Sequence, residues 1–445
     1  MLQPASNEAN ISSTGNLNRL SDKPPNTERN SVMKIYLVGG AVRDQLLALP
    51  VADRDWVVTG TTPETMQELG YRQVGKDFPV FLHPGTQEEY ALARTERKTS
   101  TGYHGFEFHT SQDVTLEEDL ARRDLTINAM AIDGESGALI DPWNGKKDLE
   151  KRLLRHISPA FAEDPLRVLR VARFCSKLAK FGFRIADETL ELMRQLSRSG
   201  ELQTLAAERV FSEIRTTLAY DDPQPFFSTL RDCGALKILW PELDQLYGIP
   251  QVPEYHPEID CGVHTMLTLQ QTCQLSDSVV ARFASLCHDL GKASTPADIL
   301  PHHYGHEERG ADITDALARR LKLPQEFRDL AIITARYHSH THRALELRPK
   351  TLLKLLQAVD CLRKPDRFEL FLLVCEGDAR GRTGFENRDY CQADFLRGAA
   401  AALKDLDTGQ IAKRANEAES NVADAVRLAR IDTLKAFIKQ WAECC

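Results

Sequence analysis

Apolar and polar positions alternate over short distances in the first part of the chain and then settle into a longer, helical spacing. Four short runs of β-forming residues, separated by turn-forming residues, predict strands at 34–38, 55–59, 79–83 and 89–94. Between the first two runs, residues 41–49 (AVRDQLLAL) have apolar residues at helical spacing. This pattern predicts a mixed α/β domain of about 130 residues.

Two further segments of this first part have patterns of their own. Residues 95–110 (TERKTSTGYHGFEFHT) are polar and contain glycine, so we predict a mobile loop there. Residues 126–133 and 138–141 are short apolar runs separated by Gly134 and Gly137, which predicts a terminal hairpin.

From Pro165 onward the spacing becomes helical, as in LRVLRVARFCSKLAKF, and helices are predicted through 185–245 and nearly to the end. The segment 248–260 contains three prolines and a glycine and is typical of a domain junction. The predicted fold class is α+β, with a small mixed-sheet head, an all-helical neck and body, and a second helical domain. The predicted divisions are an extension 1–32, the head 33–160, the neck and body 161–250, the second helical domain 251–382 and C-terminal helices 383–445.

Composition and charge narrow the class of protein. The chain is 42% apolar and 27% charged, as in ordinary globular proteins, and no run of 18 apolar residues predicts a membrane span. Ten cysteines without a CxxC pair indicate reduced thiols in the cytoplasm. Residues 1–32 are rich in Asn and Ser and lack the features of a signal peptide, so we predict a disordered extension. The net charge of −8 means that any nucleic-acid partner must meet a local basic surface.

The first candidate chemistry lies between the first two predicted strands. Gly39 and Gly40 let the backbone approach an anion, and Arg43 adds a guanidinium suited to phosphate oxygens. Asp53 and Asp55 stand one residue apart, so on a strand their carboxylates share a side and repel. Mg²⁺ between them would relieve this repulsion and bind phosphate oxygens as well. Taken alone, a Gly-Gly pair is usually only a turn, and a DxD is usually a solvated acidic pair.

The combination resembles a known family. Gly39-Gly40-x-x-Arg43-Asp44 followed by Asp53-x-Asp55 resembles the nucleotidyltransferase superfamily that includes DNA polymerase beta. Three later stretches make it similar, more narrowly, to the bacterial class II tRNA nucleotidyltransferases, the CCA-adding enzymes. These stretches are Glu96-Arg97, Arg122-Arg123-Asp124-Leu-Thr-Ile-Asn128 and Glu163-Asp164-Pro-Leu-Arg167.

The resemblance implies template-independent addition of CCA to tRNA from CTP and ATP. Asp53 and Asp55 would hold Mg²⁺ while the tRNA 3′-hydroxyl attacks the α-phosphorus and pyrophosphate leaves. The resemblance also implies nucleotide contacts from Gly39, Gly40, Arg43, Arg123, Arg170 and Arg173. Asp124 and Asn128 could equally have a structural role, holding the predicted hairpin to the glycine loop.

Asp164 and Arg167 have a physical interpretation beyond the resemblance. If both lie on a helix, the spacing of three puts an acceptor and a donor on one face. Cytosine and adenine both present an amino donor beside a ring-nitrogen acceptor, whereas uracil and guanine present a carbonyl in place of the amino group. Such a pair would accept C and A and reject U and G. The alternative is an ordinary intrahelical salt bridge.

A second constellation lies in the later helical region, where most of the thirteen histidines gather near aspartates. The series His264, His288-Asp289 and Asp378 resembles the HD phosphohydrolase family, with Asp360 competing for the last place. The resemblance implies a transition metal, Ni²⁺, Mn²⁺ or Co²⁺, and phosphatase, 2′-nucleotidase and 2′,3′-cyclic phosphodiesterase activity. His302, His303 and His306 could bind substrate phosphate or a second metal, or lie in a solvated loop. The cluster at 338–342 (HSHTH) holds more histidines than one metal site needs.

Three other functions share parts of this pattern. A bacterial poly(A) polymerase shares the head but usually carries a basic tail, which this sequence lacks. A protein-modifying nucleotidyltransferase with an HD domain would need sensing repeats after that domain. A non-catalytic RNA-binding scaffold is disfavoured by the intact acidic and histidine motifs. We expect a cytoplasmic monomer or weak homodimer that binds tRNA, CTP and ATP and no membrane.

Overall fold

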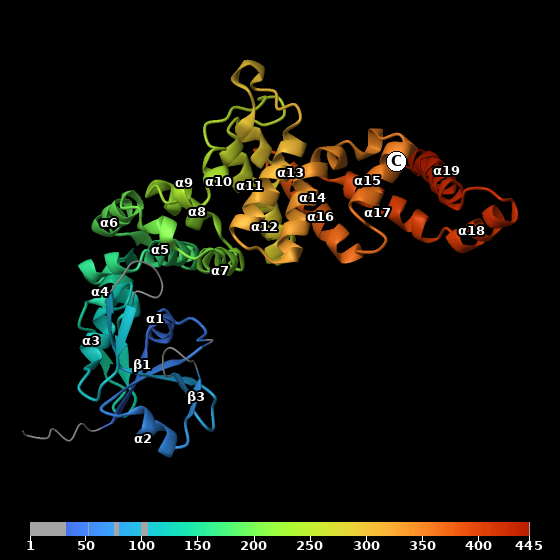
Figure 1. Cartoon of the computed structure of the whole chain (residues 1–445). Coiled ribbons are helices and arrows are strands. Elements are labelled where there is room, and N and C mark those ends of the chain that lie inside the picture. The colour runs from blue at the N-terminus through green and yellow to red at the C-terminus, as the bar shows by residue number, and fades with distance from the viewer. Residues whose placement is uncertain (1–32, 52, 75–79, 99–105, 445) are drawn as a thin grey trace, which may run out of the picture.

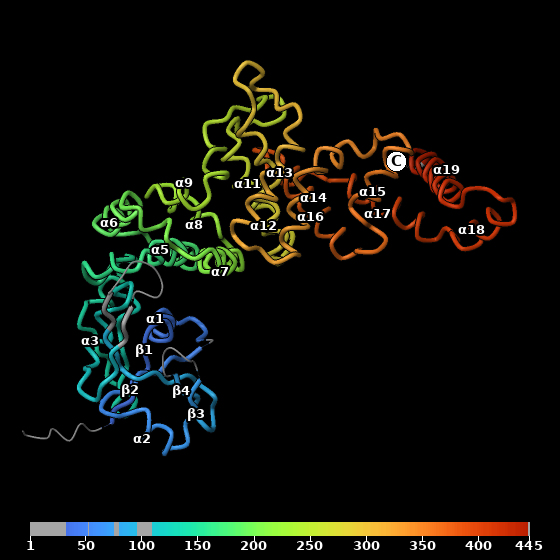
Figure 2. Tube along the Cα trace, in the orientation of Figure 1, coloured from blue at the N-terminus to red at the C-terminus, as the bar shows by residue number. Residues whose placement is uncertain are grey.

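The computed structural model describes residues 33–51, 53–74, 80–98 and 106–444, with the backbone alone for 96–98, 106–108 and 444. Its strands form a head at one end, and the helical remainder extends away from this head (Figures 1 and 2). The predicted extension 1–32 lies outside the described residues.

The head is built on a mixed sheet, which confirms the predicted fold class. Seven described strands pair in the order β3-β4-β5-β2-β1-β8-β9, and only β2 and β5 run parallel. Their bounds are β1 Lys34–Val38, β2 Asp55–Thr59, β3 Arg72–Val74, β4 Val80–Leu82, β5 Glu89–Leu92, β8 Ala131–Asp133 and β9 Leu139–Ile140. The first two agree with the predicted bounds, the next two predicted strands are shorter, and β3 was not predicted.

The sheet is covered on both faces, which explains why its central strands carry apolar residues on both sides. Successive residues of a strand point to opposite faces, and Tyr36 packs into one apolar cluster while Leu37 packs into another. Leu120 of α3 joins the cluster of Tyr36, and Val42 of α1 joins that of Leu37. The helices of the head are α1 Gly40–Leu46, α2 Pro63–Glu68, α3 Leu116–Ala121 and α4 Gly145–Glu150.

The prediction of a loop over the whole of 95–110 is wrong, because both ends of this segment form strands. Strands β6 Thr95–Lys98 and β7 Phe106–His109 pair antiparallel, with Thr95 opposite His109. Phenylalanines alternate with polar residues in FEFH, a strand pattern that the polar composition of the whole segment concealed. The hairpin predicted from 126–133 and 138–141 forms as β8 and β9, but its first three residues are a 3₁₀ turn (η2, Thr126–Asn128) rather than strand.

The neck begins with a small element that was not predicted. Strands β10 Leu153–Leu154 and β11 Arg184–Ile185 form a parallel pair that brackets α5. The neck helices are η3 Pro159–Glu163, α5 Leu166–Lys177, η4 Ala179–Phe181, α6 Asp187–Arg198, η5 Glu201–Thr204, α7 Ala207–Leu218, α8 Gln224–Asp232, α9 Leu236–Leu239 and α10 Pro241–Asp244. Helix α5 packs against α7 and α8, as its apolar spacing requires.

The second helical domain follows the junction at 248–260. Its elements are α11 Cys261–Leu275, α12 Val279–Cys287, η6 Leu290–Ser294, η7 Ala297–Ile299, α13 His306–Arg320, α14 Gln325–His342, η8 Ala344–Glu346, α15 Pro349–Ala358 and α16 Pro365–Arg380. The C-terminal helices are α17 Cys391–Lys404, α18 Thr408–Glu417 and α19 Val422–Cys444. Helices α11 and α16 cross closely: a Cβ on Gly377 would lie 2.3 Å from the Thr272 hydroxyl. Gly381 is equally confined, because a Cβ there would lie 2.6 Å from the Thr268 amide nitrogen.

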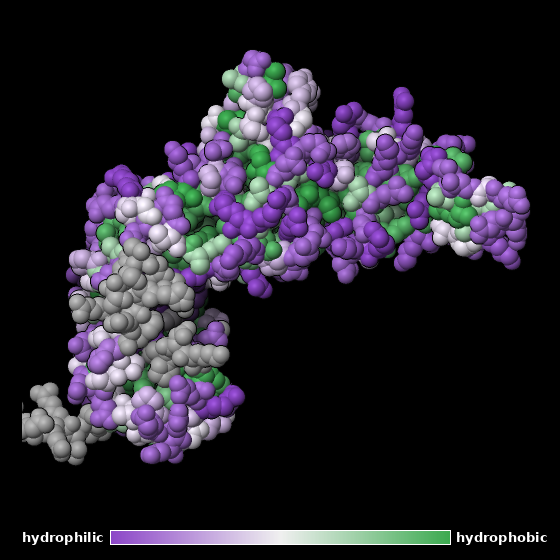
Figure 3. Space-filling view, in the orientation of Figure 1, coloured by the Kyte–Doolittle hydropathy of each residue, from purple (hydrophilic) through white to green (hydrophobic). Residues whose placement is uncertain are grey.

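One apolar core runs from the end of the head through the neck and the second helical domain into the C-terminal helices. It includes Leu154, Trp240, Phe283 and Leu434, and the Trp240 ring stacks on Phe283 with centroids 5.3 Å apart. Hydrophilic residues dominate the surface seen in Figure 3, with smaller apolar areas among them. None of the described helices is long and apolar enough to cross a membrane.

Candidate functional site

A cationic cleft lies where the head meets the neck. Its volume is about 480 Å³. Three carboxylates, those of Asp55, Asp124 and Asp164, face it. They are outnumbered by Lys177 and eight arginines, at positions 43, 94, 122, 123, 167, 170, 173 and 209. The acidic chain therefore does carry a local basic surface of the kind that a triphosphate or a nucleic-acid backbone requires.

Of the acidic pair, Asp55 lines this cleft, whereas Asp53 does not. Strand β2 begins at Asp55, so Asp53 precedes the strand rather than lying on it, which corrects the premise of two residues on one strand. Both carboxylates nevertheless line one adjoining cleft of about 550 Å³. Loss of hydration raises the pKa of Asp55, the Arg123 charge lowers it, and the Asp53 charge raises it again. Two repelling carboxylates beside a cationic wall are hard oxygen donors that fit Mg²⁺.

Gly39 has the conformation that the turn before α1 requires. Its φ is +69°, which disfavours residues with a side chain, and its amide donates to the Met130 carbonyl (3.3 Å). A Cβ at this position would lie 2.8 Å from Nη1 of Arg123. The glycine therefore lets the Arg123 guanidinium lie directly against the turn. Nη2 of Arg123 donates to Asp119 (3.1 Å), which holds the side chain in place.

Arg43 is predicted to contact phosphate, but its side chain is almost fully buried. Its Nη1 donates to Oδ1 of Asn128 (2.6 Å), and its Nε donates to Asp44 (2.8 Å). Asn128 in turn donates to Asp124 (2.9 Å). Arg43 thus joins α1 to the segment 122–128.

Asp124 is a buried acceptor at the centre of this network. Its carboxylate also accepts a hydrogen bond from Nε of Arg170 (2.8 Å). Burial alone would raise the pKa of Asp124, but the Arg170 charge and the bond from Asn128 hold the pKa well below its ordinary value. These contacts favour a structural role for Asp124 and Asn128 over direct contact with the nucleotide.

Asp164 and Arg167 do not pair on one helical face, so that prediction is wrong. Helix α5 begins at Leu166, and Asp164 precedes Pro165, a position where helical backbone is disfavoured. The Asp164 carboxylate accepts from the Leu166 amide (3.0 Å) and lies 3.4 Å from Nη2 of Arg209. Arg167 instead donates to the carbonyls of Ala160 (2.9 Å) and Arg122 (2.5 Å). Both side chains still line the cleft.

The remaining arginines of α5 are anchored by acidic or aromatic partners. Nε of Arg173 donates to Glu213 (2.6 Å). The guanidinium carbons of Arg43 and Arg173 lie 5.1 and 4.9 Å from the centre of the Phe174 ring. Sequence reasoning missed Phe174, Lys177 and Arg209; the spacing of four from Arg173 to Lys177 could have indicated the lysine, whereas Arg209 comes from a distant helix.

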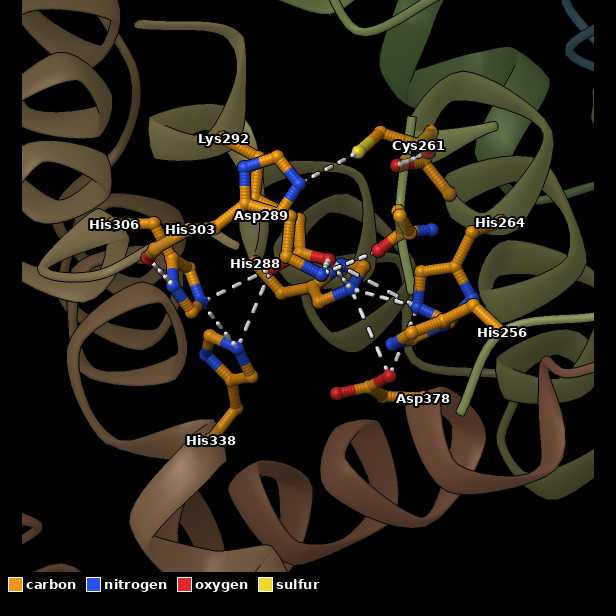
Figure 4. A network of polar contacts seen from close by, with 12 residues as sticks. His256, Cys261, His264, His288, Asp289, Lys292, His303, His306, His338 and Asp378 are labelled. Atoms are coloured by element: carbon orange, nitrogen blue, oxygen red, sulfur yellow. Dashed lines mark hydrogen bonds and ion pairs between the residues drawn. The ribbon is translucent and has the colours of Figure 1, made fainter. Parts of the chain in front are cut away.

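The second site is a buried cluster in the second helical domain (Figure 4). His264 comes from α11, His288 and Asp289 follow α12, and Asp378 comes from α16. Nε2 of His264 lies 3.0 Å from Oδ1 of Asp378 and 3.4 Å from Nε2 of His288, which lies 3.1 Å from Oδ2 of Asp289. The structure therefore brings the four predicted ligands together. Asp360 lies elsewhere and pairs with Arg363 (2.7 Å).

The ring orientations in this cluster suit a metal. The Nδ1 of His264 lies 3.0 Å from the Gly381 carbonyl, and that of His288 lies 2.7 Å from the Ser285 carbonyl. If each Nδ1 donates its hydrogen, each Nε2 presents a lone pair to the shared centre. The pKa of Asp378 is well below its ordinary value: burial opposes this shift, and the charges of His342 and His288 produce it. Imidazole nitrogens with ionised carboxylates form a donor set for a transition metal.

The histidines that the sequence left unexplained fall into different environments. His306 and His338 approach Asp289 from α13 and α14, while His342 lies 2.7 Å from Oδ2 of Asp378. His303 contacts Thr295 and the Pro250 carbonyl, His302 stacks on Tyr304, and His340 is exposed. The spacing of four between positions 338 and 342 could have indicated that these two share a helical face.

Three family models match the chain in the order of its domains. Residues 35–155 match the poly A polymerase head domain, and 182–247 match the probable RNA and SrmB-binding site of polymerase A. Residues 262–363 match the HD domain. The fold and these matches define a nucleotidyltransferase that also carries an HD domain. Proteins with these two domains depend on divalent metal.

Proteins of similar sequence identify the particular family within this class. The multifunctional CCA protein of Thioalkalivibrio sulfidiphilus is 58% identical over 414 residues, covering 92% of this chain and 100% of the relative. The chain belongs to the family of multifunctional CCA proteins. A CCA-adding enzyme in its apo form II has a similar fold, with a TM-score of 0.62, 19% identity, and coverage of 93% of this chain and 92% of that one. The Thermotoga maritima CCA-adding enzyme complexed with tRNA has a TM-score of 0.58, 18% identity, and 92% coverage of each chain.

Proposed function

We propose that this protein adds and repairs the 3′-terminal CCA of tRNA, using CTP and ATP without a nucleic-acid template. The observation that carries this proposal is the cleft in which Asp53 and Asp55 adjoin a wall of eight arginines and Lys177. A triphosphate needs such cations, and the acidic pair supplies oxygen ligands for a divalent ion beside them. The name and coverage of the relatives support the same substrates.

In the proposed reaction the tRNA 3′-hydroxyl attacks the α-phosphorus of the nucleotide, and pyrophosphate leaves. Mg²⁺, when bound, lowers the pKa of the attacking hydroxyl and neutralises the leaving group. Asp53 and Asp55 hold the ion, while Arg123, Arg170 and Arg173 orient the triphosphate. Gly39 and Gly40 let the backbone approach the phosphates, and Arg43 holds this turn in place. No side chain acts as a nucleophile.

Base selection is assigned to Asp164 and Arg167, which reach the cleft from consecutive elements. The Asp164 carboxylate accepts from the amino group of cytosine or adenine, and an Arg167 N–H donates to the neighbouring ring nitrogen. The two carbonyls that accept from Arg167 fix the direction of its guanidinium. Uracil and guanine would place a carbonyl against the carboxylate, which is repulsive.

The HD domain is proposed to hydrolyse phosphate esters, with phosphatase, 2′-nucleotidase and 2′,3′-cyclic phosphodiesterase activity. His264, His288, Asp289 and Asp378 would hold Ni²⁺, Mn²⁺ or Co²⁺, which supplies a water of lowered pKa and polarises the phosphate. Lys292 and Arg382 line the neighbouring cleft of about 550 Å³ and offer positive charge to the phosphate.

These activities divide the chain along the predicted limits. The head at 33–160 transfers the nucleotide, 161–250 selects the base and contacts tRNA, 251–382 hydrolyses, and 383–445 completes the helical body. A tRNA substrate and the free thiols of the described cysteines support a cytoplasmic protein. We propose a monomer or weak homodimer, which light scattering of the purified chain would test.

The test uses purified full-length protein, tRNA transcripts that end before CCA, and each nucleotide alone and together. Wild type should add two C and one A in the presence of Mg²⁺. Asp53→Ala and Asp55→Ala should each lower the rate at least about 100-fold, while hydrolysis of a 2′,3′-cyclic nucleotide persists. Asp113→Ala removes an exposed carboxylate of the head and should change neither activity. Long A tails would support the poly(A) polymerase alternative instead.

A further inference from the structure

Two exposed tyrosines line the cleft beside the buried histidine–aspartate cluster. Among the phenylalanines, tyrosines and tryptophans whose side chains the structure describes, only Tyr255 and Tyr304 are exposed, at 66% and 72%. Both line the same cleft of about 550 Å³ as Lys292 and Arg382. A single exposed aromatic ring is ordinary, but two at one cleft indicate a surface that binds a ligand.

The fold holds the segments that carry these tyrosines in place. Nη1 of Arg309 donates to the Tyr304 carbonyl (2.8 Å), which anchors that segment to α13. Nε2 of His303 lies 3.0 Å from the Pro250 carbonyl, which joins the segment of Tyr304 to that of Tyr255. Both rings are therefore exposed on backbone that is tied to the domain.

The deeper part of the cleft carries positive charge. Nε of Arg382 is buried and makes no hydrogen bond with any described residue, and Nη2 of the same guanidinium lies 4.0 Å from Oδ1 of Asp378. Nζ of Lys292 lies 2.6 Å from Oδ2 of Asp289. A guanidinium with an unused donor suits a phosphate oxygen. The cleft thus combines buried cations beside the cluster with aromatic rings that face solvent.

A ligand that matches both parts has a phosphate and a flat apolar ring. The cations alone are sufficient for the phosphate of any ester, so they give the two tyrosines no role. Nucleobases have such a ring, and they stack on aromatic side chains whatever their sequence. The volume of about 550 Å³ is within the range of about 300–1,000 Å³ found for small-molecule sites.

We infer that Tyr255 and Tyr304 bind the base of the substrate by stacking, so that the HD domain selects nucleotides over phosphate esters without a base. This inference rests on the proposed hydrolytic function of the domain. One face of the Tyr304 ring already stacks on His302, with centroids 5.7 Å apart and an interplanar angle of 16°, and a base on the opposite face extends this stack. Because stacking does not read the hydrogen-bonding edge of a base, we expect little preference among the four bases.

The first test compares two phosphate monoesters of secondary alcohols, 2′-AMP and glycerol 2-phosphate, of which only 2′-AMP has a base. Hydrolysis by the full-length protein is measured with Mn²⁺. Tyr255→Ala and Tyr304→Ala should each lower kcat/KM for 2′-AMP about 5- to 150-fold and leave kcat/KM for glycerol 2-phosphate unchanged. Tyr255→Phe and Tyr304→Phe keep the ring and should match wild type on both esters. Equal losses on the two esters, or full activity of the alanine variants on 2′-AMP, overturn the inference.

Photolabelling gives a second readout that does not depend on hydrolysis. Full-length protein irradiated with 8-azidoadenosine 2′-phosphate, without added metal, should carry label on the tryptic peptides 238–282 and 293–309, which contain Tyr255 and Tyr304. Label on neither peptide overturns the inference. If both peptides are labelled but no phosphate ester is hydrolysed with Mn²⁺, the proposed hydrolytic function fails while the base contact stands.

Discussion

Gly39 shows how a single backbone position can decide the shape of the cationic cleft. Its positive φ turns the chain from β1 into α1, and the missing side chain leaves room for the Arg123 guanidinium. We therefore expect Gly39→Ala to cost about 1–2 kcal/mol of folding free energy and to displace Arg123, lowering CCA addition at least about tenfold.

Gly137 provides a matched control for this substitution. It has the same φ of +69°, but a Cβ there would meet nothing within 4 Å. Gly137→Ala should therefore show the backbone strain alone, with nearly full activity. Urea unfolding and initial rates of nucleotide addition measure the two effects. Equal losses of activity in both variants would contradict the steric explanation.

The buried carboxylate of Asp124 predicts a pH dependence of stability. Its pKa in the folded protein is below the unfolded value of about 3.9, so its ionised form stabilises the fold above that pH. This stabilisation is lost as the pH falls through the folded pKa. Asp124→Asn should therefore cost about 2–3 kcal/mol at pH 7 and progressively less below about pH 4.

Urea unfolding of both proteins between pH 7 and pH 3 measures this difference. Asp113→Asn is the control, because its carboxylate is exposed, and it should stay within about 0.5 kcal/mol of wild type at every pH. A deficit for Asp124→Asn that remained constant down to pH 3 would show that its charge is not what stabilises the fold.

Residue types and spacing were sufficient to propose Asp53 with Asp55 and His288 with Asp289, because each pair lies in a short motif. The sequence could not place His306 and His338 beside Asp289, because three separate elements meet there. It also could not decide between Asp360 and Asp378. That choice depends on the crossing of α11 and α16, which no local spacing encodes.

At the scale of elements, the start of α5 fixes where Asp164 and Arg167 lie, the two residues to which we assign base selection. The X-Pro step at Asp164 ends the preceding turn and removes this residue from the helix, a signal that was present in the sequence. Strands β1 and β2 were predicted to the residue because their apolar runs are bounded by glycine or charged residues. The β6–β7 pair was not predicted because the polar composition of residues 95–110 concealed the alternation within its two short strands.

Asp164→Asn should change which nucleotides are accepted. The amide presents an N–H group where the carboxylate only accepts, so the carbonyl of uracil gains a donor. We expect discrimination between CTP and UTP, measured as the ratio of their kcat/KM values, to fall at least about tenfold. Asp113→Asn should leave this ratio unchanged. An unaltered ratio for Asp164→Asn, with activity retained, would remove Asp164 from base selection.

At the scale of the whole molecule, the neck and the second helical domain share one core. Trp240 is 1% exposed and stacks on Phe283, which connects the end of the neck to α12. The junction at 248–260 is therefore a boundary in composition and not in packing. Only long-range contacts reveal such continuity. The sequence pattern therefore predicted two separate domains where the structure has one shared core.

Trp240→Ala should consequently weaken both functions together. We expect a loss of about 3–5 kcal/mol in the free energy of unfolding and a parallel loss of nucleotide addition and phosphate-ester hydrolysis on heating. Leu428→Ala truncates an exposed side chain on α19 and should have little effect on either. Circular dichroism and the two activities, followed at the same temperatures, test this. Hydrolysis that failed while addition persisted unchanged would indicate two independent cores.

The close crossing of α11 and α16 at Gly377 and Gly381 bears on which metal ions the protein can bind. His264 and Asp378 are carried by these two helices, and Gly377 and Gly381 press against Thr272 and Thr268 without room for a methyl group. Helices in backbone contact cannot spread to enlarge the opening between their ligands. We therefore expect the proposed metal site to accept ions with bonds near ~2.0–2.2 Å and to exclude Ca²⁺, which needs ~2.3–2.6 Å and more oxygen neighbours.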